Sequence, residues 1–107
     1  MNGVYRSKTT TDAWTSDDEV GGMAHMLFDL DTTTAGLWRA GPEVADQPVE
    51  VTIPARETIL VLEGSVRVTI DRVEIHELGP GDMLSIPAQS LVGWDPSRGC
   101  MVFWVYS

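Results

Sequence analysis

The feature that most constrains the fold is the stretch from Glu57 to Pro87, ETILVLEGSVRVTIDRVEIHELGPGDMLSIP, in which apolar residues alternate and turn residues recur. A β-strand places successive side chains on opposite faces, so this alternation predicts strands with one buried face. Glycine and proline at 64, 79–81 and 87 mark the ends of the strands. The stretch therefore predicts an all-β sandwich or barrel of short strands.

Individual segments within and outside this stretch show the same strand character. Residues 49–53, VEVTI, alternate apolar and polar side chains and predict another strand. The run ILVL at 59–62 is apolar on both faces, as in a strand that is buried on both sides. Residues 23–30, MAHMLFDL, fit a short helix or a strand, and their periodicity does not decide between the two.

The central hairpin can be assigned a register. If Asp71 and Arg72 form a two-residue turn, Ile75 faces inward opposite Val68, and His76 lies on the polar surface. That turn requires a positive φ at arginine, which is unfavourable, so a loop longer by one or two residues is the alternative.

Length and composition limit the organisation of the chain. The 107 residues fit one domain, which we place at residues 23–107, preceded by an irregular Thr-, Ser- and Asp-rich arm at residues 1–22. No apolar run approaches the ~20 residues of a membrane helix, and no signal peptide is visible, so we expect a cytoplasmic protein without a membrane partner. The single cysteine, Cys100, precedes MVFWVY and is expected to be a small core residue.

The chain is strongly acidic. Sixteen acidic and seven basic side chains give a formal net charge of −9. Such a surface repels phosphate backbones, and no basic patch offsets it, so we expect no nucleic-acid partner.

The glycine and proline positions match two known motifs. Glu57 followed after six residues by Gly64 reproduces the end of the first cupin motif. Gly81, Asp82 and Pro87 reproduce the second motif, in which glycine is followed after five residues by proline. The chain thus resembles the cupin superfamily over about residues 35–107.

Finer details narrow the resemblance. The segments AGLWRAGP, VLEGSVRV and LGPGD, together with Trp94 and the closing FWVY, are similar to one branch of small cupins. That branch contains ureidoglycine aminohydrolase and the ethanolamine-utilisation cupins. The resemblance implies a double-stranded β-helix, also called a jelly roll.

The resemblance also implies a metal site of three histidines and one glutamate, but only Glu57 is present. Depending on the gap before Glu57, the histidine positions hold Glu50 and Thr52, or Val51 and Ile53, and in the second motif Val92. Transition metals in proteins favour imidazole ligands in a fixed number, so we expect no metal and no cofactor. His25 lies outside both motifs and is expected to be structural or exposed. If a metal does bind, it is the first residue to consider as a ligand.

A different kind of pocket remains. By resemblance, Glu57 points into the barrel and Trp94 lies on the facing sheet, with Trp38 and Gln89 at the mouth. The ligand-binding set is completed, if the longer gap is correct, by Glu50 and Thr52. A carboxylate near an indole suits a small organic molecule with a cationic or hydrogen-bond-donating group. Desolvation of Glu57 would also suit a general acid or base. The alternative is that these side chains only fill a small barrel.

Three functions therefore stay open: a metal-independent small-molecule cupin, a metal-dependent hydrolase or isomerase related to ureidoglycine aminohydrolase with atypical ligands, and a structural or interaction domain. We also expect a symmetric homodimer, because Trp14, Trp38 and FWVYS are predicted near exposed sheet edges. The arm would contribute by adding a strand or by packing Trp14 on the neighbour.

Overall fold

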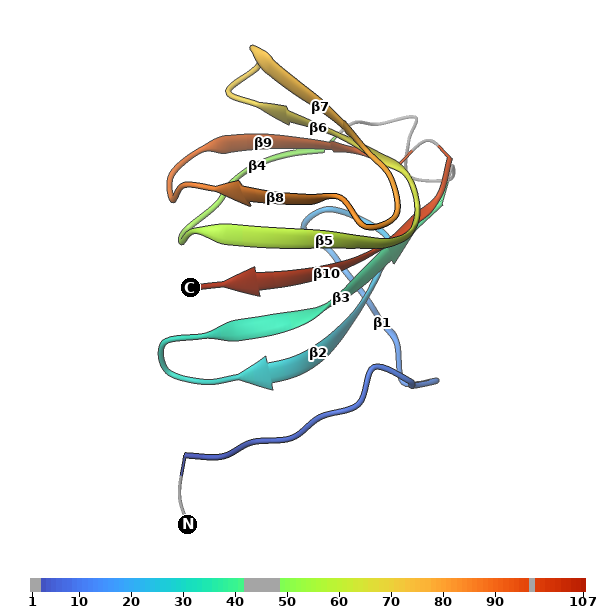
Figure 1. Cartoon of the computed structure of the whole chain (residues 1–107), viewed down its shortest axis with the longest axis vertical. Helices are drawn as coiled ribbons and strands as arrows, with labels where there is room; N and C mark the ends of the chain where they lie inside the picture. Colours follow the sequence, from blue (N-terminus) through green and yellow to red (C-terminus); the bar gives the residue numbers. More distant parts are fainter. Residues whose placement is uncertain (1–2, 42–48, 97) are drawn as a thin grey trace.

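Ten β-strands form two antiparallel sheets in the computed structural model, which describes residues 3–41, 49–96 and 98–107 (Figure 1). The six-stranded sheet has the order β1 (Thr15–Ser16), β2 (Met23–Asp29), β3 (Thr34–Ala40), β10 (Cys100–Tyr106), β5 (Glu57–Gly64) and β8 (Met83–Ile86). The four-stranded sheet has the order β4 (Val49–Thr52), β9 (Leu91–Asp95), β6 (Val66–Ile70) and β7 (Glu74–Leu78). This architecture confirms the predicted all-β jelly roll. The described residues include no helix that could span a membrane.

The core lies between the two sheets and is built by alternation along the strands. Ile59 and Val61 of β5 point inward, as do Val68 of β6, Val92 of β9 and Val102 of β10, and all five are buried. Buried apolar area is the main favourable term in folding, at roughly 25 cal/mol per Å². β10 pairs with both β3 and β5 and is therefore the central strand of the larger sheet. Cys100 is buried in this core, as the sequence predicted.

The hairpin of β6 and β7 has a different register from the two-residue turn that the sequence suggested. Val68 pairs with His76, and Ile75 is 61% exposed instead of facing the core. Three residues, 71–73, lie outside the ladder, so the longer loop is correct. Asp71 and Arg72 both adopt positive φ, 52° and 63°. Because side chains alternate with a period of two, this single extra residue moves every β7 side chain to the opposite face.

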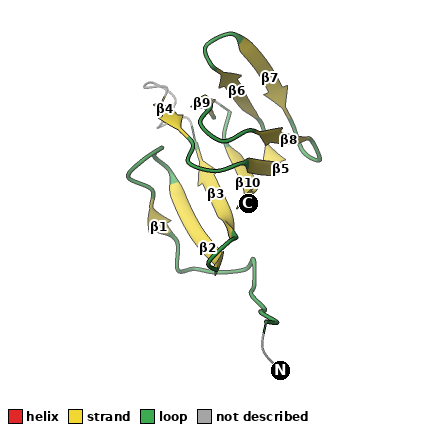
Figure 2. Cartoon of the chain, turned by 90° about the vertical axis from the view of Figure 1, so that its left-hand side faces the viewer, coloured by secondary structure: helices red, strands yellow, loops and turns green. Residues whose placement is uncertain are grey.

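The segment before β2 is ordered against its own chain. β1 pairs with β2, so part of the predicted irregular arm forms a strand, and residues 23–29 are themselves a strand. Residues 17–22 form a turn in which Asp17 Oδ1 accepts two backbone N–H groups. The Nε1–H of Trp38 donates to the carbonyl of Gly21 at 2.7 Å, and Figure 2 shows the turn near β4. The turn is thereby held over the space between the sheets.

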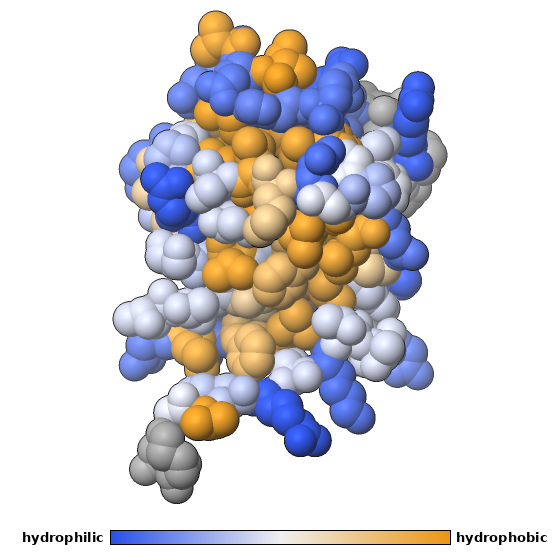
Figure 3. Space-filling view, in the orientation of Figure 1, coloured by the Kyte–Doolittle hydropathy of each residue, from blue (hydrophilic) through white to orange (hydrophobic). Residues whose placement is uncertain are grey.

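The opposite side of the six-stranded sheet is apolar and only partly covered. Figure 3 shows hydrophobic side chains gathered over the middle of this sheet in the view of Figure 1. They come from strand positions that alternate with the core residues, so they point away from the barrel. We call this surface the outer face, and define it by Leu60, Leu62, Met83, Met101, Phe103 and Val105.

Candidate functional site

A cavity of about 230 Å³ lies between the two sheets, beneath the 17–22 turn. Its walls are mainly apolar and aromatic, and both sheets contribute to them. The ionisable side chains at the cavity are three carboxyl groups and one phenol: Asp17, Glu19, Glu57 and Tyr106. Such a concave, largely apolar space with a few polar groups is the usual form of a small-molecule site.

Glu57 is the polar group buried deepest in this cavity. It begins β5, where its backbone is paired on one side with Tyr106 of β10 and on the other with Ile86 of β8. The residue is 6% exposed, and its Oε1 atom has no hydrogen-bond partner. Burial, with a smaller contribution from the Glu19 carboxylate, raises the pKa of Glu57 to about 7. The carboxyl group therefore changes its charge near neutral pH.

Four aromatic side chains line the same cavity as Glu57, and their rings form two tilted pairs. The centroids of Trp38 and Trp94 are 5.9 Å apart with an interplanar angle of 59°. Those of Trp104 and Tyr106 are 5.4 Å apart at 48°. Burial raises the pKa of Tyr106 above its ordinary value, and the nearby carboxylates Glu57, Glu19 and Asp17 raise it further. The phenol therefore stays protonated and keeps a proton to donate.

The structure brings Trp38, Glu57 and Trp94 together, three of the residues selected from the sequence. It also adds residues that the sequence reasoning missed. Asp17 and Glu19 had been assigned to an irregular arm, although the Asp- and Gly-rich segment SDDEVGG is typical of a turn. Trp104 and Tyr106 had been assigned to a core or interface strand. Alternation along β10 could have placed both rings on the inward face with Val102.

Glu50 and Thr52 do not line the cavity. They lie on the outward face of β4, while Val51 and Ile53 face the cavity. The shorter of the two possible gaps before Glu57 is therefore the one that the structure shows. Glu50 instead forms a two-point ion pair with Arg72, with Nη2–Oε1 and Nε–Oε2 distances of 2.9 and 3.0 Å. The hydrogen bond and charge of Arg72 lower the pKa of the Glu50 carboxyl.

Gln89 also lies outside the cavity lining. It sits in the exposed turn between β8 and β9 with a φ of 70°. Its backbone N–H donates to the carbonyl of Ile53 at 2.8 Å. Its backbone thus helps to position the residue that follows β4, and its exposed side chain is not among the residues that line the cavity.

The residues present do not fit a transition-metal site. The positions that would hold histidines carry Val51, Ile53 and Val92, and aliphatic side chains offer no lone pair to a metal. Within residues 3–41, 49–96 and 98–107, no group of three His, Cys, Asp or Glu side chains is arranged to hold a metal ion. His25 Nε2 lies 3.2 Å from the carbonyl of Lys8, and His76 Nε2 lies within hydrogen-bond distance of Glu74 Oε2.

Residues 29–100 match the EutQ-like cupin domain family. The ethanolamine utilization protein EutQ of Salmonella typhimurium LT2 is 18% identical with a TM-score of 0.76, over 87% of this chain and 76% of that chain. The Clostridium difficile EutQ protein is 17% identical with a TM-score of 0.68, over 94% and 69%. Fe(II)-HppE with the alternative substrate (S)-1-HPP is 12% identical with a TM-score of 0.79, over 100% and 62%. No curated protein matches the sequence.

The low identities of the structural matches make them evidence for the fold alone. The family match is of a different kind, because it extends over most of the chain. It includes Glu57, Gly64, Gly81 and Pro87, the motif positions from which the resemblance was first drawn. This chain therefore belongs to the EutQ-like cupin domain family.

Proposed function

We propose that this protein binds a small organic molecule in its barrel without a transition metal. The observation that carries the proposal is the Oε1 atom of Glu57, which is buried at the cavity and has no hydrogen-bond partner. Burying a polar atom without a partner costs about 1–3 kcal/mol, so such atoms commonly mark a place where a ligand or ordered water binds. The aromatic walls then supply apolar contact for the rest of the ligand.

Glu57 also has the properties of a general acid or base. A group with a pKa near the working pH is present in both protonation states and can exchange a proton with a bound molecule. Its pKa of about 7 meets this condition. If a reaction takes place in the cavity, Glu57 is the residue that we assign to proton transfer.

A metal-dependent reaction like those of other cupins is less well supported. The fold similarity to Fe(II)-HppE exists at 12% identity, and Val51, Ile53 and Val92 replace the nitrogen ligands that the resemblance implied. A structural or interaction domain is the remaining alternative. It differs from a binding protein in having no ligand that stabilises the fold.

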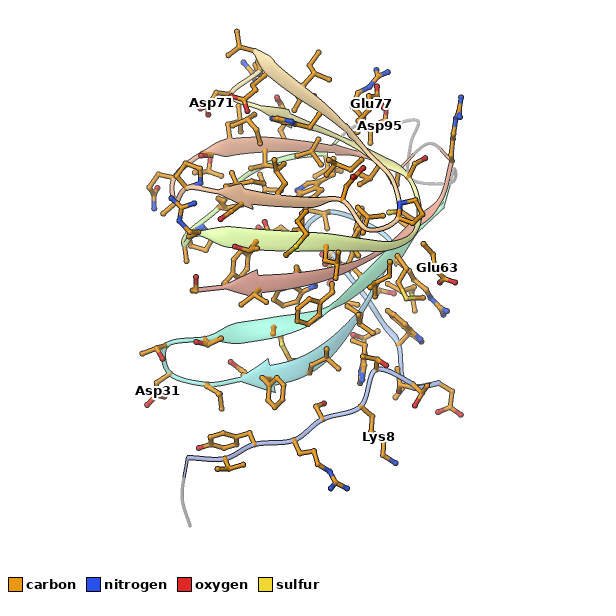
Figure 4. All side chains as sticks on the ribbon, in the orientation of Figure 1. Lys8, Asp31, Glu63, Asp71, Glu77 and Asp95 are labelled. Carbon is orange, nitrogen blue, oxygen red and sulfur yellow. The ribbon has the colours of Figure 1, made fainter. Side chains whose placement is uncertain are left out.

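A thermal-shift screen of the purified protein with small amines, ureido compounds and sugars tests the proposal. A ligand that binds only the folded state raises the melting temperature by mass action. We expect at least one compound to do so, and expect Glu57→Gln to reduce the shift. Glu63→Gln is the matched control, because Glu63 lies on the same strand but is exposed and points away from the barrel (Figure 4). No stabilising compound, or equal shifts in all three proteins, would favour the structural domain.

A further inference from the structure

We infer that the molecule bound in the barrel is a small organic cation with N–H groups, such as a primary alkylammonium. This inference rests on the proposed function and narrows it to one chemical class. It stands on three properties of the cavity, which are its unsatisfied acceptor, its charge and its size.

The acceptor is Glu57 Oε1. Glu57 lines the cavity, and the described protein supplies no hydrogen-bond donor to this buried atom. A carboxylate only accepts hydrogen bonds, so a ligand that satisfies it must carry a donor. An ammonium group offers up to three N–H donors, and a hydrogen bond between two charged groups is about twice as strong as a neutral one.

The charge of the cavity excludes anions and favours cations. Asp17, Glu19 and Glu57 all line it, and no lysine, arginine or histidine is among the described lining residues. The faces of the Trp38 and Trp94 rings carry negative partial charge and attract a cation placed over them. The field at this site is therefore negative from both its carboxylates and its rings.

The size of the cavity limits the ligand. A volume of about 230 Å³ holds roughly eight waters at about 30 Å³ each, so the ligand has at most about ten non-hydrogen atoms. A primary alkylammonium of four or so carbons fits this space. Its alkyl chain would contact the rings, and its ammonium group would reach Glu57.

Cation binding is coupled to the ionisation of Glu57. The titratable groups that face Glu57 are Tyr106 from β10 and Asp17 and Glu19 from the 17–22 turn, and none of them is a cation. Glu57 is largely protonated below its pKa of about 7, so a cation must displace its proton there. Affinity should then fall about tenfold for each pH unit below that value.

Titration calorimetry with n-butylammonium chloride, n-butanol and sodium butyrate provides the test. At pH 8 we expect binding of butylammonium only, a loss of at least tenfold in Glu57→Gln, and no change in Glu63→Gln. Tetramethylammonium, which lacks N–H groups, should bind more weakly than butylammonium. At pH 6 the affinity for butylammonium should be about tenfold lower than at pH 8, with proton release to the buffer.

The outcomes separate this inference from the proposed function. If butanol or butyrate binds as tightly as butylammonium and depends on Glu57, the cation inference is overturned and small-molecule binding stands. If none of the probes binds at millimolar concentration, the cation inference is overturned, and the thermal-shift screen decides whether the barrel binds a small molecule of another class. Circular dichroism of Glu57→Gln shows whether a loss of binding reflects the missing charge or a damaged fold.

A second inference rests on the outer face, which is independent of the cavity. We propose that a second copy of this chain packs on it. The run ILVL at 59–62 is apolar at every position, as in a strand that is covered on both sides, yet one chain covers only the inward residues. Met83 is 62% exposed and Leu62 is 39% exposed on the uncovered side.

Charge on the outer face permits self-association. The six residues that define the outer face are all uncharged, although the chain has sixteen acidic residues. Glu63, which pairs with Met101, lies at one end of the face. Two copies with a net charge of −9 each repel one another elsewhere, but over the uncharged part of this face they can approach without placing carboxylates opposite each other.

The outer face alone is too small for a stable dimer interface, which indicates that the N-terminal arm also contributes to it. Three strands about 4.8 Å apart, each with five or six residues of about 3.3 Å, give this face roughly 250 Å². A stable interface buries about 800 Å² on each partner. The N-terminal arm extends beyond β2 in Figures 1 and 2, with Val4 74% and Tyr5 61% exposed. The arm of one copy can supply the missing area by crossing onto the other.

This interface keeps Phe103 and Val105 of the FWVYS segment that the sequence suggested, but it does not use the two tryptophans. Trp38 is buried in the cavity. Trp14 packs within its own chain, with its ring centroid 6.0 Å from that of His25 and the Arg39 guanidinium 4.3 Å above it. Trp38 is therefore not available to a partner, and Trp14 is half-buried against its own chain. The apolar surface that remains is the outer face.

Sedimentation equilibrium at micromolar concentration tests the second inference. We expect the wild type to sediment as a dimer and Leu62→Glu to sediment as the 11.7 kDa monomer. Ile75→Glu is the control, because Ile75 is also an exposed strand residue but lies on β7 of the other sheet. A monomeric wild type, or dissociation by both substitutions alike, would overturn the proposal.

Discussion

Replacing Glu57 by glutamine should make this protein more stable at neutral and alkaline pH. The substitution keeps the size and shape of the side chain and removes its charge. Burial, together with the Glu19 carboxylate, raises the pKa of Glu57 from 4.5 to about 7 in the folded protein. The unfolded chain restores the ordinary value, so ionisation of Glu57 destabilises the folded state by about 3 kcal/mol at pH values well above 7.

The effect has a definite dependence on pH. Below pH 4.5 Glu57 is protonated in both states, so wild type and variant should have similar free energies of unfolding. Between pH 4.5 and about 7 the folded protein keeps a proton that the unfolded chain has released, so wild-type stability falls as the pH rises. Above that window Glu57 is ionised in both states, and the advantage of the variant reaches its full value.

Urea denaturation followed by tryptophan fluorescence measures this difference. The advantage of Glu57→Gln should be below about 1 kcal/mol at pH 5 and about 3 kcal/mol at pH 8. Glu63→Gln removes the same charge at an exposed position and should show no comparable change between the two pH values. An advantage that is equal at pH 5 and pH 8, or that Glu63→Gln reproduces, would refute the reasoning.

Three further predictions concern the backbone, the 17–22 turn and metal content. Gly64→Ala should lower the free energy of unfolding by more than about 3 kcal/mol, because the new Cβ would lie 2.1 Å from the Gly99 carbonyl oxygen. Gly81→Ala is the control. Its Cβ would meet no atom within 4 Å, so only the positive φ should cost stability, by about 1–2 kcal/mol in urea unfolding. Trp38→Phe removes the 2.7 Å hydrogen bond to Gly21, so hydrogen exchange in residues 17–22 should speed up at a cost of about 1 kcal/mol, and unchanged exchange would contradict the contact. Elemental analysis of protein purified without tag or chelator should find no stoichiometric Mn, Fe, Ni or Zn, and one equivalent that is lost in Glu57→Gln would mean that the site has been misplaced.

Much of the fold could be predicted from the sequence because its signals are local. Alternation identifies strands, and the glycines and prolines at 64, 79–81 and 87 end them where the structure does. What the motif spacing does not determine is the face that residues 49–53 present to the barrel. Alternation favours the apolar Val51 inward, whereas the longer motif gap before Glu57 favours Thr52. Pairing of β4 with β9 resolves the choice in favour of Val51.

The candidate site was predictable only in its central part. Trp38, Glu57 and Trp94 could be found because their positions relative to motif residues carry structural information. The turn that brings Asp17 and Glu19 to the cavity could not, because its placement depends on a hydrogen bond between residues seventeen apart and on the pairing of β1 with β2. Such contacts are invisible to a pattern that is read a few residues at a time.

The contribution of Glu57 to stability bears directly on what the residue is for. Substituting a side chain that stabilises the fold should make the protein less stable. Glu57→Gln, in contrast, is expected to make it more stable at pH 8. A destabilising group that is buried and unpartnered is typical of a binding or catalytic site, where stability is commonly lower than the scaffold allows. A bound cation would supply the donor and the opposite charge that Glu57 lacks, so it should stabilise the wild type more at pH 8 than at pH 5. Stabilisation by butylammonium that grows with pH in the wild type and is absent in Glu57→Gln would link the cost of burying the Glu57 carboxylate to the ligand that it binds. If butylammonium stabilised the wild type equally at pH 5 and pH 8, the cation would have to bind somewhere other than against the Glu57 carboxylate.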